Sequence, residues 1–67
     1  MKYRVDDWVG YCALPDVEYF KDERKRVLIL DVLDKDPFYD YKIYIEESQK
    51  IKKVREHQLF PGAPPTY

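Results

Sequence analysis

Alternation of apolar and polar residues over positions 37–61 constrains the fold of this chain more than any other feature. Within a strand expected over 38–46, odd positions share one face and even positions share the other. One face holds Tyr39, Tyr41, Ile43 and Ile45, and the other holds Asp40, Lys42, Tyr44 and Glu46. A period of two with one apolar face is typical of a β-strand that is buried on one side. A turn over 47–50 and a strand over 51–55 follow, so the segment predicts an antiparallel hairpin.

The strand over 51–55 departs from a simple alternation. Ile51 and Val54 are out of phase by one residue. A β-bulge between them would turn both side chains toward the core, because a bulge adds one unpaired residue to a strand. We therefore expect a bulge in this strand.

The most apolar run, VLILDVL at 27–33, predicts the central strand of the sheet. It is rich in β-branched residues, and its length is short for a helix but usual for a strand. A helix is the competing interpretation. Residues 34–37 form a turn into the next strand. The expected core consists of Val9, Tyr11, Val27, Ile29, Tyr41, Ile43, Ile45, Val54 and Leu59.

Shorter elements are expected in the rest of the chain. Residues 8–13 predict a first strand, and a long loop over 14–26 follows it. Residues 56–60 predict a single 3₁₀ turn, which Pro61 ends. The expected organisation is one domain over 1–61 and a flexible Pro-rich tail over 62–67.

Composition limits what else the chain can contain. With 67 residues it forms one domain with a small core. Its single cysteine, Cys12, excludes an internal disulfide, and one cysteine with one histidine cannot assemble a zinc site. The lone cysteine and the lack of a signal-type or membrane-spanning apolar run predict a cytoplasmic protein without a membrane partner. No metal and no cofactor are expected.

The expected all-β fold, with about five antiparallel strands, a long first loop and a terminal 3₁₀ turn, resembles a small SH3-like barrel of the Tudor, chromo-barrel and KOW kind. The resemblance covers residues 3–61. The sequence Val5-Asp6-Asp7-Trp8-Val9 is similar to the Val-Gly-Asp-x-Val opening of that superfamily, with Asp6 in place of glycine, and Glu56-His57-Gln58-Leu59 is similar to its closing turn. Tyr39-Asp40-Tyr41 and Glu56-His57-x-Leu59 also resemble small uncharacterised SH3-like proteins encoded by prophages of Gram-positive bacteria. This likeness implies a phage or prophage accessory protein.

A protein-binding surface is the function that requires the fewest specific residues, so it is the preferred interpretation. Tyr44 is the preferred anchor, because it lies on the polar face of its strand, where packing does not explain a ring. Adjacent acidic and basic segments, at 31–47 and 50–55, would dock a complementary partner or pair two copies of the chain. The expected binding residues are Tyr19, Phe20, Tyr44, Lys50, Lys52, Lys53 and Arg55.

Nucleic-acid binding is the first alternative, since the resemblance to KOW and Tudor-like barrels implies basic strands with exposed rings. The basic residues of the last strand would track phosphates, and Tyr44 or Phe20 would stack a base. The net charge of −1 argues against it, because such domains usually carry a strong positive charge.

An aromatic cage for methylated cations is the second alternative, also implied by the resemblance to Tudor-like barrels. Rings surround such a cation, and an acidic group completes the site. A period of two, however, places Asp40 on the face opposite Tyr39 and Tyr41, which favours packing of both rings in the core or at the barrel rim. The cage residues would be Trp8, Tyr39, Tyr41 and Asp40.

Catalysis is not expected. His57 is the only histidine and Cys12 the only thiol, and no predicted base lies beside Ser48. No set of nucleophile, base and orienting group can therefore be drawn. The chain is interpreted as a non-enzymatic interaction module.

Overall fold

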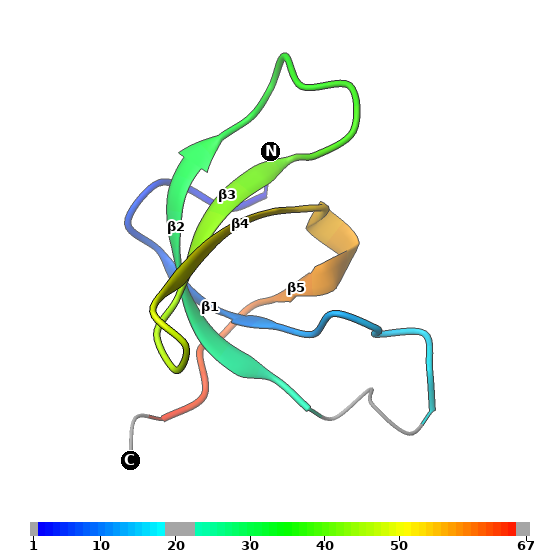
Figure 1. Ribbon diagram of the computed structural model, residues 1–67, viewed down its shortest axis with the longest axis vertical. Helices are drawn as coiled ribbons and strands as arrows, with labels where there is room; N and C mark the ends of the chain where they lie inside the picture. The colour runs from blue at the N-terminus through cyan, green and yellow to red at the C-terminus, as the bar shows by residue number, and fades with distance from the viewer. Residues whose placement is uncertain (1, 19–22, 66–67) are drawn as a thin grey trace.

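The fold was analysed in a computed structural model, which describes residues 2–18 and 23–65. Five strands form one antiparallel sheet (Figure 1). The elements are β1 (Trp8–Tyr11), β2 (Lys25–Val32), β3 (Tyr41–Ile45), β4 (Lys50–Val54), the 3₁₀ turn η1 (Glu56–Gln58) and β5 (Leu59–Phe60). The described residues contain no α-helix, so the all-β prediction is confirmed and the helical interpretation of 27–33 is wrong.

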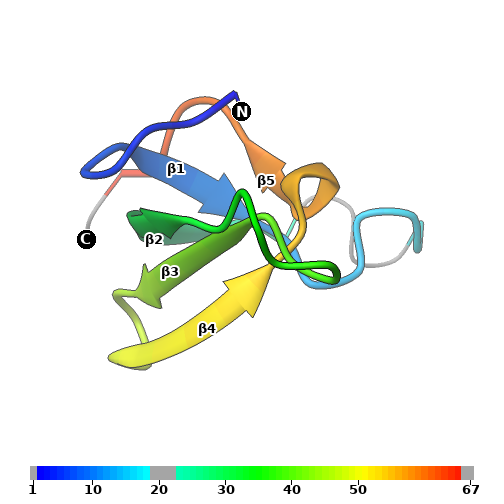
Figure 2. The ribbon, with the colours of Figure 1, turned by 90° about the horizontal axis from the view of Figure 1, so that it is seen from above.

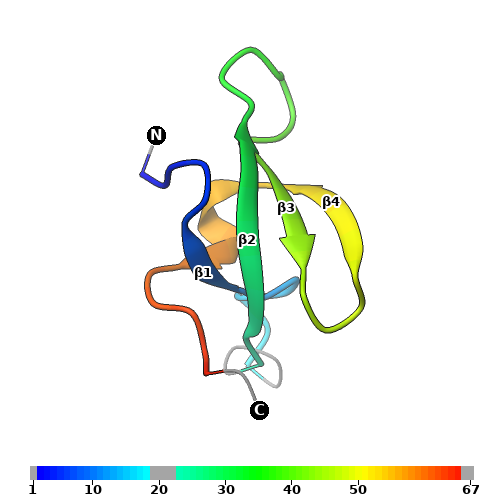
Figure 3. The same cartoon turned by 90° about the vertical axis from the view of Figure 1, so that its left-hand side faces the viewer.

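The order of the strands in the sheet is β4-β3-β2-β1-β5. The long strand β2 is therefore central and pairs with β1 on one side and β3 on the other. Figures 2 and 3 show how the strands curl, with η1 and β5 behind β2 when β2 faces the viewer. This order is compatible with an SH3-like barrel. The hydrogen-bonded sheet stays open, and β4 and β5 are its two edges.

The core lies on the concave side of the curled sheet. All nine residues predicted for the core are buried, and Tyr41, Val27, Ile29 and Ile43 are fully excluded from solvent. Val27 pairs with Ile45 and Ile29 with Ile43, so alternate positions of β2 and β3 stack into one apolar layer. Tyr3 and Cys12 are buried as well. Neither was predicted, because Tyr3 lies outside the alternating segments and Cys12 falls on the face opposite Val9 and Tyr11 in the strand expected over 8–13.

The predicted bulge in the last strand is wrong. The pairing of β3 with β4 is regular, and Ile51 is 59% exposed. The irregularity lies instead in β2, between Ile29 and Asp31. There it allows both Ile29 and Val32 to pack on the core opposite β3. At an edge strand such as β4, only Val54 reaches the core, so nothing turns Ile51 inward.

Strand β3 begins at Tyr41, three residues later than the alternation predicted. The Asp36 carboxylate causes the difference, because its Oδ1 accepts hydrogen bonds from the backbone N–H groups of Phe38 (2.8 Å) and Tyr39 (2.9 Å). These bonds fold the backbone into a local turn that competes with the strand ladder. Both rings are exposed as a result.

The same two hydrogen bonds predict a pH dependence of this loop. They favour the ionised carboxylate, so the pKa of Asp36 lies below its ordinary value of 3.8. The folded loop is then fully stabilised above pH 3.8, and this stabilisation is lost as the pH falls through the lower folded-state pKa. We expect the amide proton shifts of Phe38 and Tyr39 to titrate together in NMR spectra with a midpoint below 3.8. In Asp36→Asn this titration should vanish, and its persistence would contradict the assignment.

Asp6 takes a left-handed backbone conformation, with φ at 73°. The Val-Gly-Asp-x-Val opening of SH3-like barrels, which this segment resembles, has glycine at this position. Glycine adopts such angles without steric cost. The bend is held by its neighbours: the Asp6 N–H donates to the Ile29 carbonyl (2.9 Å), and the Asp7 Oδ2 accepts from the Arg4 N–H (2.9 Å). The turn therefore forms around an aspartate, which tolerates these angles better than most residues do.

Candidate interaction surface

Four apolar side chains form a row across the outer face of the sheet. Trp8 pairs with Leu28, Leu28 with Tyr44, and Tyr44 with Ile51, so the row crosses β1, β2, β3 and β4. Residues paired in register share one face, and the neighbouring positions on β2 and β3 are in the core. The row therefore faces away from the core. We call it the outer stripe, and Figure 3 shows its four strands from this side.

The outer stripe is partly exposed to solvent along its length. Trp8 is 38% exposed and Ile51 59% exposed, and the two central residues, Leu28 and Tyr44, are half-buried. The hydroxyl of Tyr44 offers a polar group beside this apolar surface, a combination that is usual for interface anchors. The prediction that Tyr44 points away from the core is confirmed.

Two pairs of opposite charge flank the centre of the outer stripe. On one side, Arg26 Nε lies 3.0 Å from Glu46 Oε2. On the other side, Asp31 of β2 pairs in register with Lys42 of β3. Strand β2 thus carries a cation and then an anion, and the facing residues, Glu46 just after the end of β3 and Lys42 near its start, carry the opposite signs. We call these four residues the charge quartet.

Arg26 links the outer stripe to the C-terminal segment. Its guanidinium lies over the Trp8 ring, 4.3 Å from the centroid, and its Nη1 donates to the Pro64 carbonyl at 3.4 Å. Arg24 is placed similarly over the Phe60 ring at 4.1 Å. Gly62, with φ at 83°, turns the chain after β5 so that the tail can reach this position. Ala63 and Pro64 are half-buried there.

The basic residues predicted for the binding surface are divided between the two faces of β4. Lys53 pairs with Lys42 on the outer face, and its Nζ lies 3.7 Å from Asp36 Oδ2. Lys50 and Lys52 pair with the core positions Ile45 and Ile43, so they lie on the other face. Lys52 Nζ is 5.8 Å from the centroid of the Tyr11 ring. Arg55 follows β4 and is exposed, and Tyr19 and Phe20 lie outside the described residues.

The residues considered for an aromatic cage have other roles in the fold. Tyr41 is fully buried, and its hydroxyl accepts a hydrogen bond from the Tyr3 N–H at 3.0 Å. Asp40 Oδ2 accepts from the Glu56 N–H at 2.8 Å and so holds the start of η1. Trp8 belongs to the outer stripe, and Tyr39 to the loop before β3. The structure therefore does not bring these four residues into one open site.

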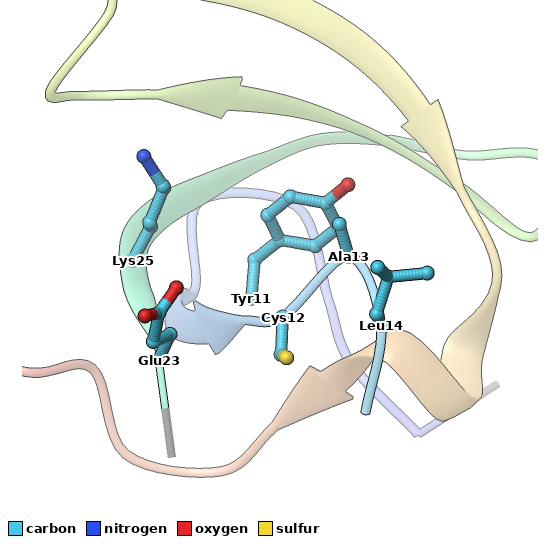
Figure 4. A pocket seen from close by; sticks show the side chains of 6 residues that line it. All are labelled: Tyr11, Cys12, Ala13, Leu14, Glu23 and Lys25. Atoms are coloured by element: carbon cyan, nitrogen blue, oxygen red, sulfur yellow. The ribbon is translucent and has the colours of Figure 1, made fainter. Parts of the chain in front are cut away.

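Two hollows lie near the start of β2. The smaller, of about 240 Å³, is lined by Tyr11, Cys12, Ala13, Leu14, Glu23 and Lys25. Figure 4 shows the Tyr11 ring between Lys25 and Leu14. The Tyr11 hydroxyl is buried and has no hydrogen-bond partner among the residues described. The larger, of about 410 Å³, lies between Arg24, Lys25, Arg26, Glu46, Glu47, Pro64 and Pro65.

Within residues 2–18 and 23–65, no group of three or more His, Cys, Asp or Glu side chains is placed to hold a metal ion. No helix in the same ranges has the length and apolar character that a bilayer span needs.

Sequence reasoning identified Tyr44 but not its three neighbours in the row. Leu28 and Trp8 were indistinguishable from core residues, because their segments carry apolar groups on both faces. The position of Ile51 depended on a bulge that the structure places in β2 instead. The register in which the strands pair would have been needed to place these three residues beside Tyr44.

A scan against protein-family models gave no match, and searches of curated proteins and of solved structures returned no match either.

Proposed function

We propose that this chain is a small, non-enzymatic protein-binding module with an SH3-like architecture, and that it contacts its partner through the outer stripe. The observation that carries the proposal is the unbroken row Trp8, Leu28, Tyr44 and Ile51 on the face opposite the core. Single exposed apolar residues are ordinary, whereas a contiguous row over four strands marks an interaction surface.

The composition of the outer stripe favours a protein partner. Trp and Tyr are enriched among residues that dominate binding energy, and aliphatic neighbours help to exclude water around them. The sheet edge is a weaker candidate, since Lys50, Lys52 and Lys53 place three positive charges along β4 and discourage the addition of another strand. Binding is therefore expected on the face of the sheet and not at this edge.

The cellular setting belongs to the same proposal. The single cysteine favours a reducing compartment such as the cytoplasm. The resemblance of the Tyr39-Asp40-Tyr41 and Glu56-His57-x-Leu59 segments to small prophage-encoded SH3-like proteins favours an accessory role in a phage or prophage.

Site-directed photocrosslinking tests this function. A photoreactive phenylalanine analogue is placed at Ile51 in the outer stripe, with a matched control at the exposed loop residue Lys35. After irradiation of cells that express each variant, position 51 should yield discrete adducts with protein and position 35 should not. Absence of protein adducts at 51, or the same adducts at both positions, would overturn the proposal.

Nucleic acid is the second candidate, favoured by one observation. Lys42 and Lys53 face each other directly on the outer face, beside Tyr44 and Ile51. Like charges in this arrangement repel, and a phosphate lying over both lysines would bridge them. The acidic neighbours Asp31 and Asp36 already offset part of that repulsion, so the candidate ranks second.

Salt-dependent binding of a single strand tests the second candidate. Fluorescence anisotropy with a labelled mixed-sequence oligonucleotide should show binding that weakens as salt is added. Lys42→Glu with Lys53→Glu should abolish it, and Lys50→Glu with Lys52→Glu, on the other face, should retain it. A null titration of the native protein would exclude nucleic acid as the ligand.

A further inference from the structure

We propose that the outer stripe binds a second copy of this chain, face to face, around a two-fold axis that runs parallel to β2 and β3 between them. The inference rests on the proposed function, because it names the partner that the same surface fits best. It is carried by the distribution of charge around the centre of the outer stripe.

The charge quartet is complementary to itself under this rotation. The rotation places β2 of one copy against β3 of the other. Each residue of β2 therefore faces, in the second copy, the counterpart of the β3 residue with which it pairs inside its own chain. Arg26 then meets Glu46 of the second copy, and Asp31 meets Lys42. Every contact that the rotation creates between facing members of the quartet joins opposite charges. An isologous interface requires this self-complementarity of one patch.

The apolar centre obeys the same rotation. Leu28 of one copy lies against Tyr44 of the other, and the ends of the row, Trp8 and Ile51, exchange in the same way. An aromatic ring against an aliphatic side chain forms the dry centre, and the charge quartet forms a polar rim. This arrangement of an apolar centre and a charged rim is the usual anatomy of a protein interface.

The second copy also relieves a repulsive pair on the outer face. Lys42 stands in register between Asp31 and Lys53, so it has one attractive and one repulsive neighbour across the strands. The Nζ of Lys53 already lies 3.7 Å from Asp36 Oδ2, so Lys53 has a negative neighbour of its own. Under the two-fold rotation Asp31 of the second copy approaches Lys42 and adds a second negative charge beside it. The like-charged contact of the monomer is thus better compensated in the dimer.

The size of the chain gives a reason for pairing. A standard interface takes about 800 Å² from each partner, about one-sixth of the 4944 Å² that this chain exposes. A domain of 67 residues buries a small share of its surface on folding, and association increases that share. Pairing through the β4 edges would instead bring lysines against lysines.

Charge reversal tests the proposed dimer. Sedimentation equilibrium of the native chain should show a reversible monomer–dimer equilibrium. Asp31→Lys and Lys42→Asp should each raise the dissociation constant by about tenfold or more, because each replaces two attractive contacts by repulsive ones. In an equimolar mixture of the two variants, the introduced lysine of one chain faces the introduced aspartate of the other, and association should return. A monomeric native chain at several hundred micromolar, or a mixture no stronger than its components, would overturn the proposal.

A matched pair of tyrosine variants controls for folding. Tyr44→Ala removes the centre of the proposed interface and should abolish the dimer, whereas Tyr39→Ala removes a ring that is 41% exposed in a loop and should leave it intact. Circular dichroism confirms that each variant is folded. A dimer that survives Tyr44→Ala in a folded chain would exclude this interface. If the native chain is monomeric while Ile51 still crosslinks to another protein, the self-pairing fails and the proposed function stands; crosslinking to nucleic acid alone would reject both.

Discussion

Replacing Tyr41 by alanine is expected to remove a large part of the free energy that keeps this protein folded at 25 °C. Tyr41 is fully buried, lies edge-on to the Tyr3 ring at 5.7 Å between centroids, and accepts the Tyr3 N–H through its hydroxyl. Truncating a buried aromatic residue costs about 3–5 kcal/mol. A chain of this size has a total free energy of unfolding of about 3–10 kcal/mol. Urea denaturation followed by circular dichroism measures the loss.

Two neighbouring variants separate the causes of that loss. Tyr41→Phe keeps the ring and removes only the acceptor of the Tyr3 N–H, so it should cost about 1–3 kcal/mol. Tyr39→Ala removes an exposed ring two residues away and should change stability by less than about 0.5 kcal/mol. Equal losses for Tyr39→Ala and Tyr41→Ala would contradict the placement of Tyr41 in the core.

Replacing Ile29 by alanine should cost about 2–5 kcal/mol, because this residue is fully buried at the centre of β2. The space that it leaves is enclosed by the core side chains Ile43 and Val27, which belong to rigid strands and cannot collapse freely. The midpoint of urea unfolding reports the change directly.

Ile51→Ala is the matched control for Ile29→Ala. The same side chain is removed from the exposed face of an edge strand, so the stability should change by less than about 0.5 kcal/mol. This result would also confirm that β4 has no bulge, since a bulge that turned Ile51 inward would make the two losses similar. Binding through the outer stripe should weaken in Ile51→Ala although its folding is preserved.

Local periodicity was sufficient to predict which residues of β3 face the core. In β3 alternate residues enter the core and each carries an apolar side chain, whereas the consecutive apolar residues of β2 do not distinguish its two faces. Tyr3 was not predicted because it lies outside strands, where no period applies. Cys12 was not predicted because the strand expected over 8–13 places it opposite Val9 and Tyr11, whereas β1 ends at Tyr11. Tyr3 is buried through contacts with Tyr41 and with the Leu59 carbonyl, both far away in sequence.

The outer stripe depended on information that a single strand does not carry. Which residues become neighbours across strands is set by register, and one irregularity shifts every later pair. The irregularity between Ile29 and Asp31 decides that Lys42 faces Asp31, and hence the charge pattern of the outer face. The late start of β3 has a different cause, since the Asp36 side chain competes locally with strand pairing.

The pairing of β1 with β5 has a consequence for how fast this protein can fold. Tyr11 pairs with Leu59, and the Tyr3 hydroxyl donates to the Leu59 carbonyl across a sequence separation of 56. Contacts between such distant residues carry a large loop-closure entropy, so folding is expected on the order of milliseconds to seconds. During synthesis at about 5–20 residues per second, β5 is made roughly 2–10 s after β1. Through that interval Val9 and Tyr11 lack the β5 neighbour that completes their burial.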